Sequence, residues 1–239
     1  MGMNRAIVIG ATSGIGRELV RQLAGAGYTV GAAGRRDNLL LELQKEFPDK
    51  IHVKRIDVVQ PEAMGLLKEL IAAMGGTDLL IISSGTGFIN RELEWAKERE
   101  TIDVNVYGFA AMCNVAFEYF REKGAGHIVG ISSLSAIRGS GEGPAYNASK
   151  AFASNYLEGL RQNAVKQKLP LTVTDIQCGL VDTAMAKGEG LFWVAPPAKA
   201  AGQILDAIRK KKDHAYITKR WRIIALLLKA LPGWLYCRI

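Results

Sequence analysis

Residues 5–16 read Arg-Ala-Ile-Val-Ile-Gly-Ala-Thr-Ser-Gly-Ile-Gly, an apolar run that ends in a glycine-rich loop. The apolar run predicts a buried strand, and the segment that follows predicts a helix. A glycine loop at such a junction places bare backbone N–H groups and the positive end of a helix where a pyrophosphate can bind. The alternative is an ordinary tight turn. We expect this loop to bind a nucleotide through Gly10, Thr12, Ser13, Gly14, Ile15 and Gly16.

The rest of the chain alternates between apolar, strand-like runs and helical stretches. This alternation predicts an α/β fold of the Rossmann type, a doubly wound parallel sheet with helices on both faces. The expected strands lie near residues 5–10, 28–33, 51–56, 78–83, 126–132, 171–177 and 214–218. The expected helices lie near residues 14–26, 37–47, 61–74, 91–123, 145–168 and 196–211.

Length and composition favour one globular domain. The chain has 239 residues, of which 49% are hydrophobic and 23% charged, so it can bury a sizeable core. Its three cysteines are irregularly spaced and form no metal-ligand pattern, so we expect a reducing compartment and no metal. The first residues lead directly into the first strand without a signal-peptide pattern, so we expect a cytoplasmic location.

The positive charge is concentrated near the end of the chain. Residues 209–239 hold nine basic side chains and only Asp213 as an acid, which accounts for the whole net charge of +8. No recognised nucleic-acid module accompanies this charge, so nucleic acid is not an expected partner. We therefore divide the chain into a catalytic domain over residues 1–218 and a basic, apolar helical tail over residues 219–239.

The tail is predicted to form an amphipathic helix. Its apolar side chains at positions 223, 224, 227, 228 and 231 share one helical face, with cations nearby. The apolar stretch is too short to span a membrane, which takes about 20 residues. Three interpretations remain open: peripheral contact with an anionic membrane, a cover over the mouth of the site, and contact with a partner subunit.

The end of the second expected strand indicates which nucleotide binds. An NAD site has an acidic residue there, which binds the ribose 2′-hydroxyl. This chain instead has Arg35 and Arg36, whose guanidinium groups suit a 2′-phosphate. The alternative is that the arginines only begin a solvated helix. We therefore predict NADP(H) as the cofactor.

Tyr146 and Lys150 lie four residues apart and so share one face of a predicted helix. A free tyrosine is a weak base at neutral pH, and a nearby ammonium group favours its phenolate. Ser133, at the end of an expected strand, can hold a substrate oxygen beside Tyr146. These three residues predict acid–base chemistry at an oxygen-bearing carbon.

The glycine loop, Ser133, Tyr146 and Lys150, in this order, resemble the short-chain dehydrogenase/reductase family over about residues 5–218. The resemblance implies a strand order of 3-2-1-4-5-6-7. It also implies that Asn105 completes a tetrad with these side chains and anchors a proton-relay water. A homodimer joined by the helices near residues 91–123 and 145–168 is implied as well.

The resemblance also implies further cofactor contacts. The expected additional contacts are Asp57, Val58, Ser84, Gly85, Gly179, Val181 and Thr183, together with Tyr146 and Lys150. Three positions depart from the usual family pattern: Ile9 replaces a threonine, Ser83 an asparagine and Cys178 a proline. None of these changes removes a catalytic group, but they make it unsafe to transfer a substrate from well-known members.

The segment 184–197 corresponds to the substrate lid of the family. Its bulky side chains, Met185, Leu191, Phe192 and Trp193, suggest an apolar substrate, and Gly188 and Gly190 would let it move. The alternative is that these side chains only pack on the fold. We therefore predict an NADP(H)-dependent oxidoreductase that interconverts a carbonyl and an alcohol. The alternatives are an NAD-dependent alcohol dehydrogenase and a non-catalytic, nucleotide-sensing protein.

Overall fold

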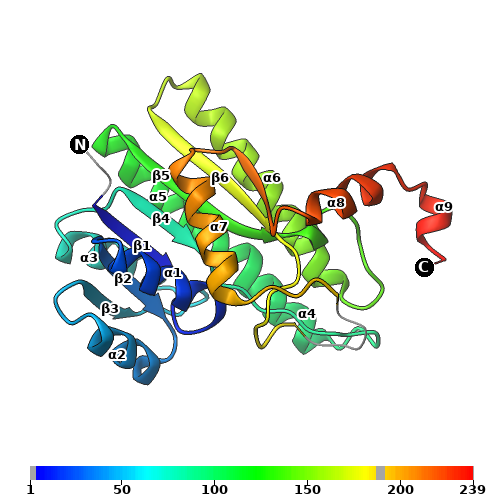
Figure 1. The fold of residues 1–239 in the computed structure, drawn as a ribbon, viewed down its shortest axis with the longest axis horizontal. Helices are drawn as coiled ribbons and strands as arrows, with labels where there is room; N and C mark the ends of the chain where they lie inside the picture. The colour runs from blue at the N-terminus through cyan, green and yellow to red at the C-terminus, as the bar shows by residue number, and fades with distance from the viewer. Residues whose placement is uncertain (1–3, 187–191, 239) are drawn as a thin grey trace.

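The computed structural model describes residues 4–186 and 192–238, and its centre is a seven-stranded parallel sheet (Figure 1). The strand order is β3-β2-β1-β4-β5-β6-β7, which confirms the predicted fold class and topology. The strands are β1 (Arg5–Ile9), β2 (Thr29–Gly34), β3 (Ile51–Arg55), β4 (Leu79–Ile82), β5 (Gly126–Ser133), β6 (Leu171–Cys178) and β7 (His214–Ile217).

Helices cover both faces of this sheet and divide the core into two layers. One apolar cluster joins the sheet to α1 (Gly14–Gly25), α2 (Asp37–Glu46) and α7 (Pro197–Arg209). The other joins it to α3 (Ala63–Ala73), α5 (Phe109–Lys123) and α6 (Pro144–Lys166). The four side chains of β4 are all fully buried, as a strand packed on both faces requires.

The helix predicted over residues 91–123 is wrong in two respects. Helix α4 (Trp95–Ile102) begins later, because the Asn90 side chain accepts a hydrogen bond from the Glu94 N–H at 3.0 Å and holds residues 91–94 in a turn. Between α4 and α5 the chain forms a π-helical turn, η1 (Asp103–Gly108). Such turns are rare and often occur at functional sites.

The strand order reverses direction between β1 and β4, which creates a crevice at their carboxyl ends. Ile9 pairs with Ala33 of β2 on one side and with Ile82 of β4 on the other. From β1 the chain winds outward to β3 and then returns to place β4 on the opposite side. In open α/β sheets, ligands bind outside the carboxyl ends at such a switch point.

The tail forms two short helices, α8 (Trp221–Ala230) and α9 (Gly233–Tyr236), which project beyond the sheet and its covering helices (Figure 1). Helix α8 packs on the domain through Trp221 and Ala225, whereas Ile223 and Leu227 are exposed. The predicted apolar face therefore packs only in part: Ile224 and Leu228 are half-buried beside Trp221 and Ala225, while the rest of the stripe turns outward. No helix within the described residues is long and apolar enough to cross a membrane.

Candidate active site

A cavity of about 870 Å³ follows the carboxyl ends of the strands. We call the part over β1, β2 and β3 the cofactor end, and the part over β5, β6 and α8 the substrate end. Every residue predicted to bind the cofactor lines this cavity, and so do Ser133, Tyr146 and Lys150. Asn105 is the exception, because it lies behind the cavity wall. The volume is in the upper part of the usual range for ligand pockets, about 300–1,000 Å³.

The glycine loop places main chain, without side chains, against the cavity. Gly10 has φ of +88°, and a Cβ atom there would lie 2.5 Å from the Ser84 backbone nitrogen. A Cβ atom on Gly16 would lie 2.2 Å from the Gly10 carbonyl oxygen, so only glycine lets α1 approach β1 this closely. The Gly14 Cα faces the Thr183 methyl group, since a Cβ atom there would be 2.9 Å from it. Thr183 therefore borders the loop from the opposite wall.

Arg36 fixes the hydroxyl groups of the loop. Its Nη2 donates to Thr12 Oγ1 at 2.6 Å and to Ser13 Oγ at 2.8 Å, and its Nε also donates to Thr12 at 3.1 Å. Arg35 is exposed and makes no hydrogen bond or ion pair from its side chain within the described part of the chain. The two guanidinium groups therefore differ: one positions the loop, and the other faces the cavity and solvent.

The wall on the other side of the cofactor end comes from the segments after β3 and β4. Val58 is buried and packs beside Gly108, while half-buried Asp57 turns the chain by accepting from the Val59 N–H. The Ser84 hydroxyl is buried without a hydrogen-bond partner among the described residues. This orphaned polar group, the bare glycine backbone and the arginine pair fit a phosphorylated dinucleotide, which would supply the missing partners.

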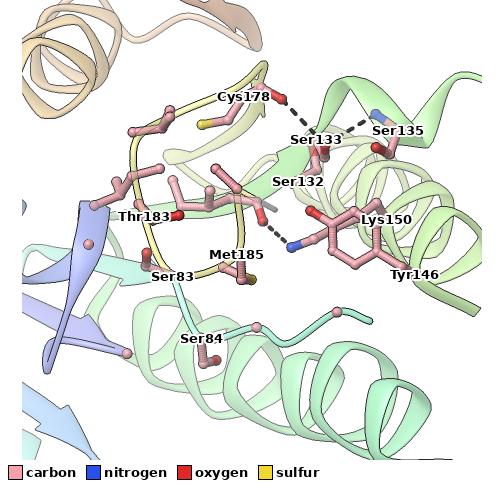
Figure 2. Close-up of a pocket in the computed structure, with 18 of the residues that line it drawn as sticks. Ser83, Ser84, Ser132, Ser133, Ser135, Tyr146, Lys150, Cys178, Thr183 and Met185 are labelled. Atoms are coloured by element: carbon pink, nitrogen blue, oxygen red, sulfur yellow. Dashed lines mark hydrogen bonds between the residues drawn. The ribbon is translucent and has the colours of Figure 1, made fainter. Parts of the chain in front are cut away.

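Ser133, Tyr146 and Lys150 gather at one side of the cavity (Figure 2). The Ser133 hydroxyl accepts from the Ser135 N–H at 3.1 Å and donates to the Cys178 carbonyl at 3.3 Å, which fixes the serine at the end of β5. Lys150 is 7% exposed and donates to the Ile131 carbonyl at 3.1 Å. Its Nζ lies 5.7 Å from the centre of the Tyr146 ring.

Burial dominates the protonation of these groups. It raises the pKa of Tyr146, and the neighbouring Ser133 hydroxyl only partly opposes this. It lowers the pKa of Lys150 to about 8, and the attraction of the Asp175 carboxylate opposes this only in part. The pKa of Tyr146 is therefore raised in this structure, where the sequence predicted a lowered one, because burial disfavours the charged phenolate. A neutral phenol beside a serine hydroxyl is suited to donate a proton.

Asn105 lies in the π-helical turn η1 and is 3% exposed. Its side chain accepts from the Thr86 N–H at 2.9 Å and donates to the Thr86 carbonyl at 2.7 Å. It also donates to the Ser149 hydroxyl at 3.0 Å. Gly85 separates Asn105 from Lys150, because a Cβ atom there would lie 3.3 Å from Lys150 Nζ and 3.4 Å from Asn105 Oδ1. The asparagine thus joins α6 to the loop after β4.

The segment after β6 is covered by the tail. The Trp221 indole lies directly on Gly179, where a Cβ atom would be 2.3 Å from the ring. Val181, buried nearby, pairs with Ala195 in an isolated bridge. Cys178 also lines the cavity, and burial raises the pKa of its thiol to about 12, so the thiol stays protonated. These contacts support the interpretation of the tail as a cover over the mouth of the site.

Several residues at the substrate end were not predicted from sequence. They are Phe88, Ile89, Leu134, Arg138, Trp221, Leu228 and Tyr236. Only Arg138 carried a usable signal, because it follows Ser133 by five residues in the same loop. Of the predicted lid, Met185 lines the cavity, and Phe192 and Trp193 pack on Trp221 with ring centres 5.1 and 5.7 Å away. Gly188, Gly190 and Leu191 lie outside the described residues.

Comparison with known proteins identifies the family of the chain. The family model for short chain dehydrogenases matches residues 4–191. An uncharacterized oxidoreductase of Myxococcus xanthus is 38% identical over 67% of this chain, and the match spans 66% of that protein, just under two thirds. An uncharacterized oxidoreductase of Mycobacterium tuberculosis is 29% identical over 95% of this chain and 94% of its own length.

Solved structures show the same fold. A short-chain dehydrogenase from Streptomyces avermitilis superposes with a TM-score of 0.82 at 24% identity, covering 99% of this chain and 94% of its own. A serine dehydrogenase solved with NADP+ superposes with a TM-score of 0.77 at 25% identity, covering 85% and 88%. The fold and the cavity define a nucleotide-binding oxidoreductase. The chain belongs to the short-chain dehydrogenase family.

Proposed function

We propose that the protein is an NADP(H)-dependent reductase that interconverts a carbonyl and an alcohol on an apolar substrate. The observation that carries the proposal is the placement of Ser133, Tyr146 and Lys150 in the same cavity as the arginine pair. In this proposal residues 1–218 form the catalytic domain and residues 219–239 form an appended tail. Arg35 and Arg36 would hold the ribose 2′-phosphate of NADP(H), and the glycine loop would hold its pyrophosphate.

The mechanism follows from the protonation of the site. When bound, the nicotinamide would supply the hydride for reduction of the carbonyl or accept it in oxidation of the alcohol. The Ser133 hydroxyl orients the substrate oxygen, and neutral Tyr146 donates its proton to that oxygen during reduction. Protonated Lys150 stabilises the phenolate that this transfer leaves behind. Asn105 holds the loop after β4 against α6 and supports the path by which the proton is restored. Oxidation of the alcohol reverses these steps.

The chemistry is tested with Tyr146→Phe in a panel of aldehydes and ketones of graded chain length. We expect NADPH consumption by the wild type and a loss of about 10²- to 10⁴-fold in kcat for the variant, since a positioned proton donor contributes that much. NADPH should still bind, because the glycine loop and the arginine pair are intact. Wild-type binding of NADPH without turnover on any compound would favour the nucleotide-sensing alternative.

Cofactor choice is tested with Arg35→Ala. Arg36 also holds Thr12 and Ser13, so its removal should weaken both cofactors. Arg35 has no such role, and its loss should weaken NADPH binding by about 10- to 100-fold and leave NADH binding unchanged. Equal losses for both cofactors, or tighter NADH than NADPH binding by the wild type, would favour the NAD-dependent alternative.

We also propose a homodimer formed by the helices α4, α5 and α6. Trp95 of α4, Tyr107 of the adjoining turn η1 and Val165 of α6 are 68%, 56% and 72% exposed, which supports an unfilled contact on this side of the molecule. Sedimentation of the wild type and of Trp95→Glu tests this. A wild-type monomer at micromolar concentration would exclude the dimer.

For the tail we propose peripheral contact of a cytoplasmic protein with anionic lipid. Ile223, Leu226 and Leu227 are 58%, 56% and 61% exposed on α8, and basic residues flank them. An apolar stripe with flanking cations is typical of interfacial helices. Co-sedimentation should occur with vesicles that contain phosphatidylserine and be lost in Leu227→Asp. No pelleting of the wild type, or equal pelleting with neutral vesicles, would rule the contact out.

A further inference from the structure

One cation at the substrate end has no role in the chemistry proposed so far. Arg138 follows the short helix η2 (Leu134–Ala136), lies five residues after Ser133 and lines the cavity. Its backbone is fixed, because its carbonyl accepts from the Asn147 side chain at 2.7 Å and Asn147 belongs to α6. The side chain is half-buried. The arginine therefore starts from a rigid position one short loop away from the catalytic serine.

The tail holds the Arg138 side chain in place. Its guanidinium carbon lies 4.6 Å from the centre of the Tyr236 ring, in a cation–π contact. The Tyr236 hydroxyl donates to the carbonyl of Gly139 at 2.5 Å, which fixes the ring over the arginine. A ring on the face of a guanidinium leaves its in-plane N–H groups available. These groups can make the forked hydrogen bonds that a carboxylate accepts.

No described acidic group neutralises this cation. Arg138 makes no ion pair within residues 4–186 and 192–238. Glu142, the acidic residue that also lines this part of the cavity, is paired with Arg91. The remaining wall is mostly apolar and includes Phe88, Leu134, Met185 and Trp221. The substrate end thus has an apolar wall and one positive charge. Several residues of the chain separate this charge from Ser133 and from Tyr146.

We propose that Arg138 binds a carboxylate of the substrate, so that the enzyme acts on an apolar carbonyl or hydroxyl compound that carries an acid group. The proposal rests on the reductase function given above and names its substrate class. The carboxylate accepts a forked pair of bonds from Arg138, the apolar body contacts Trp221 and its neighbours, and the reacting oxygen lies between Ser133 and Tyr146. One guanidinium balances one negative charge, which favours a carboxylate over a doubly charged phosphate.

A binding titration tests this without any turnover. Decanoate and decan-1-ol have the same number of carbon atoms and differ in charge, and neither can accept a hydride from NADPH. We expect decanoate to change the tryptophan fluorescence of the NADPH-bound protein at a concentration about 10- to 100-fold lower than decan-1-ol does. Arg138→Gln should remove this preference and leave decan-1-ol binding within about twofold. Arg138→Lys should keep part of it.

The matched control is Arg222→Gln. Arg222 is an exposed cation of the tail, and its side chain does not line the cavity. This variant should bind decanoate as the wild type does. A loss that is equal in both variants would reflect general attraction to the basic tail and would overturn the proposal. So would equal affinity of the wild type for decanoate and decan-1-ol.

Turnover then separates this proposal from the reductase function. The enzyme should reduce 10-oxodecanoate with a higher kcat/KM than decanal, and Arg138→Gln should remove the difference mainly through KM. Tyr146-dependent reduction that favours decanal would overturn the carboxylate site and leave the reductase standing. Selective decanoate binding with no reduction of either compound would overturn the reductase and leave the anion site standing.

Discussion

The two ends of the cavity differ in what forms their walls. At the cofactor end, the wall consists largely of short loops that directly follow β1, β2 and β3, and glycine backbone forms much of it. At the substrate end, the wall consists of side chains from segments as distant as Phe88 and Tyr236. The first end depends on backbone geometry within single loops. The second depends on how separate segments pack, and chiefly on how the tail is held.

The largest effect on stability is expected from Trp221→Ala, which removes the main packing contact of the tail. The indole is 4% exposed and lies on Gly179, so its removal leaves a cavity and should lower the free energy of unfolding by about 3–5 kcal/mol. Substrate KM should rise by a larger factor than the NADPH dissociation constant does, because Trp221 lies on Gly179 but not on the glycine loop or the arginine pair. Urea unfolding and an NADPH titration measure the two effects.

Trp234→Ala is the matched control, because this tail tryptophan is 66% exposed. Its loss should change stability by less than about 0.5 kcal/mol. If Trp221→Ala weakened NADPH binding as much as it raised the substrate KM, the two ends would not be separable in the way described here.

The next effect concerns Lys150, which lies where the two ends meet. Its pKa is lowered from 10.5 to about 8 because burial disfavours the charged form. At pH 7 the buried ammonium group therefore lowers the free energy of unfolding by up to about 3 kcal/mol, at 1.36 kcal/mol per pKa unit. Lys150→Met should unfold at higher urea concentration than the wild type at pH 7 and lose activity.

The sign of this effect gives its pH dependence. Below about pH 8 both the folded and the unfolded lysine are protonated, so the whole cost is present. Between about pH 8 and 10.5 the folded state releases its proton first, so the wild type gains stability relative to Lys150→Met as the pH rises. If the two proteins differed by the same free energy of unfolding at every pH from 7 to 10, burial would not destabilise the charged form of Lys150.

The smallest effect is expected at the cofactor end, where adding one Cβ atom tests the close approach of α1 to the glycine loop. Gly16→Ala brings a Cβ to 2.2 Å from the Gly10 carbonyl oxygen, and the resulting shift should cost about 1–3 kcal/mol of stability. NADPH affinity should fall with it, because Gly10 belongs to the binding loop. Gly25→Ala lies in the same helix with nothing within 4 Å and should be neutral or slightly stabilising. Similar effects of both variants would show that the close approach does not matter.

The same contrast explains what could be predicted from sequence. The glycine loop, Arg35 and the Tyr146–Lys150 pair were found because each is local: a loop at a strand end, or two positions one helical turn apart. The fold followed from periodicity and strand alternation. Asn105 was placed only through family resemblance, and the π-helical turn that contains it has no simple sequence pattern.

The substrate end could not be predicted in this way. Arg138 becomes part of a site only when Tyr236, almost a hundred positions later, lies over it. The protonation of Tyr146 was also misjudged, because sequence shows the nearby lysine but not the depth of burial. The packing face of α8 was predicted only in part for a related reason: the place of Trp221 on Gly179 decides which side of the helix packs, and Ile223 and Leu227 of the apolar stripe stay exposed.

The contact of Trp221 with Gly179 also bears on how substrate selectivity can change among enzymes of this kind. The match to the family model ends at residue 191, whereas the wall formed by Trp221, Leu228 and Tyr236 lies beyond it. Changes in residues 219–238 can therefore reshape what enters the cavity without disturbing the sheet, the glycine loop or the acid–base pair. Grafting this segment between relatives that keep a glycine at position 179 offers a direct route to engineered selectivity.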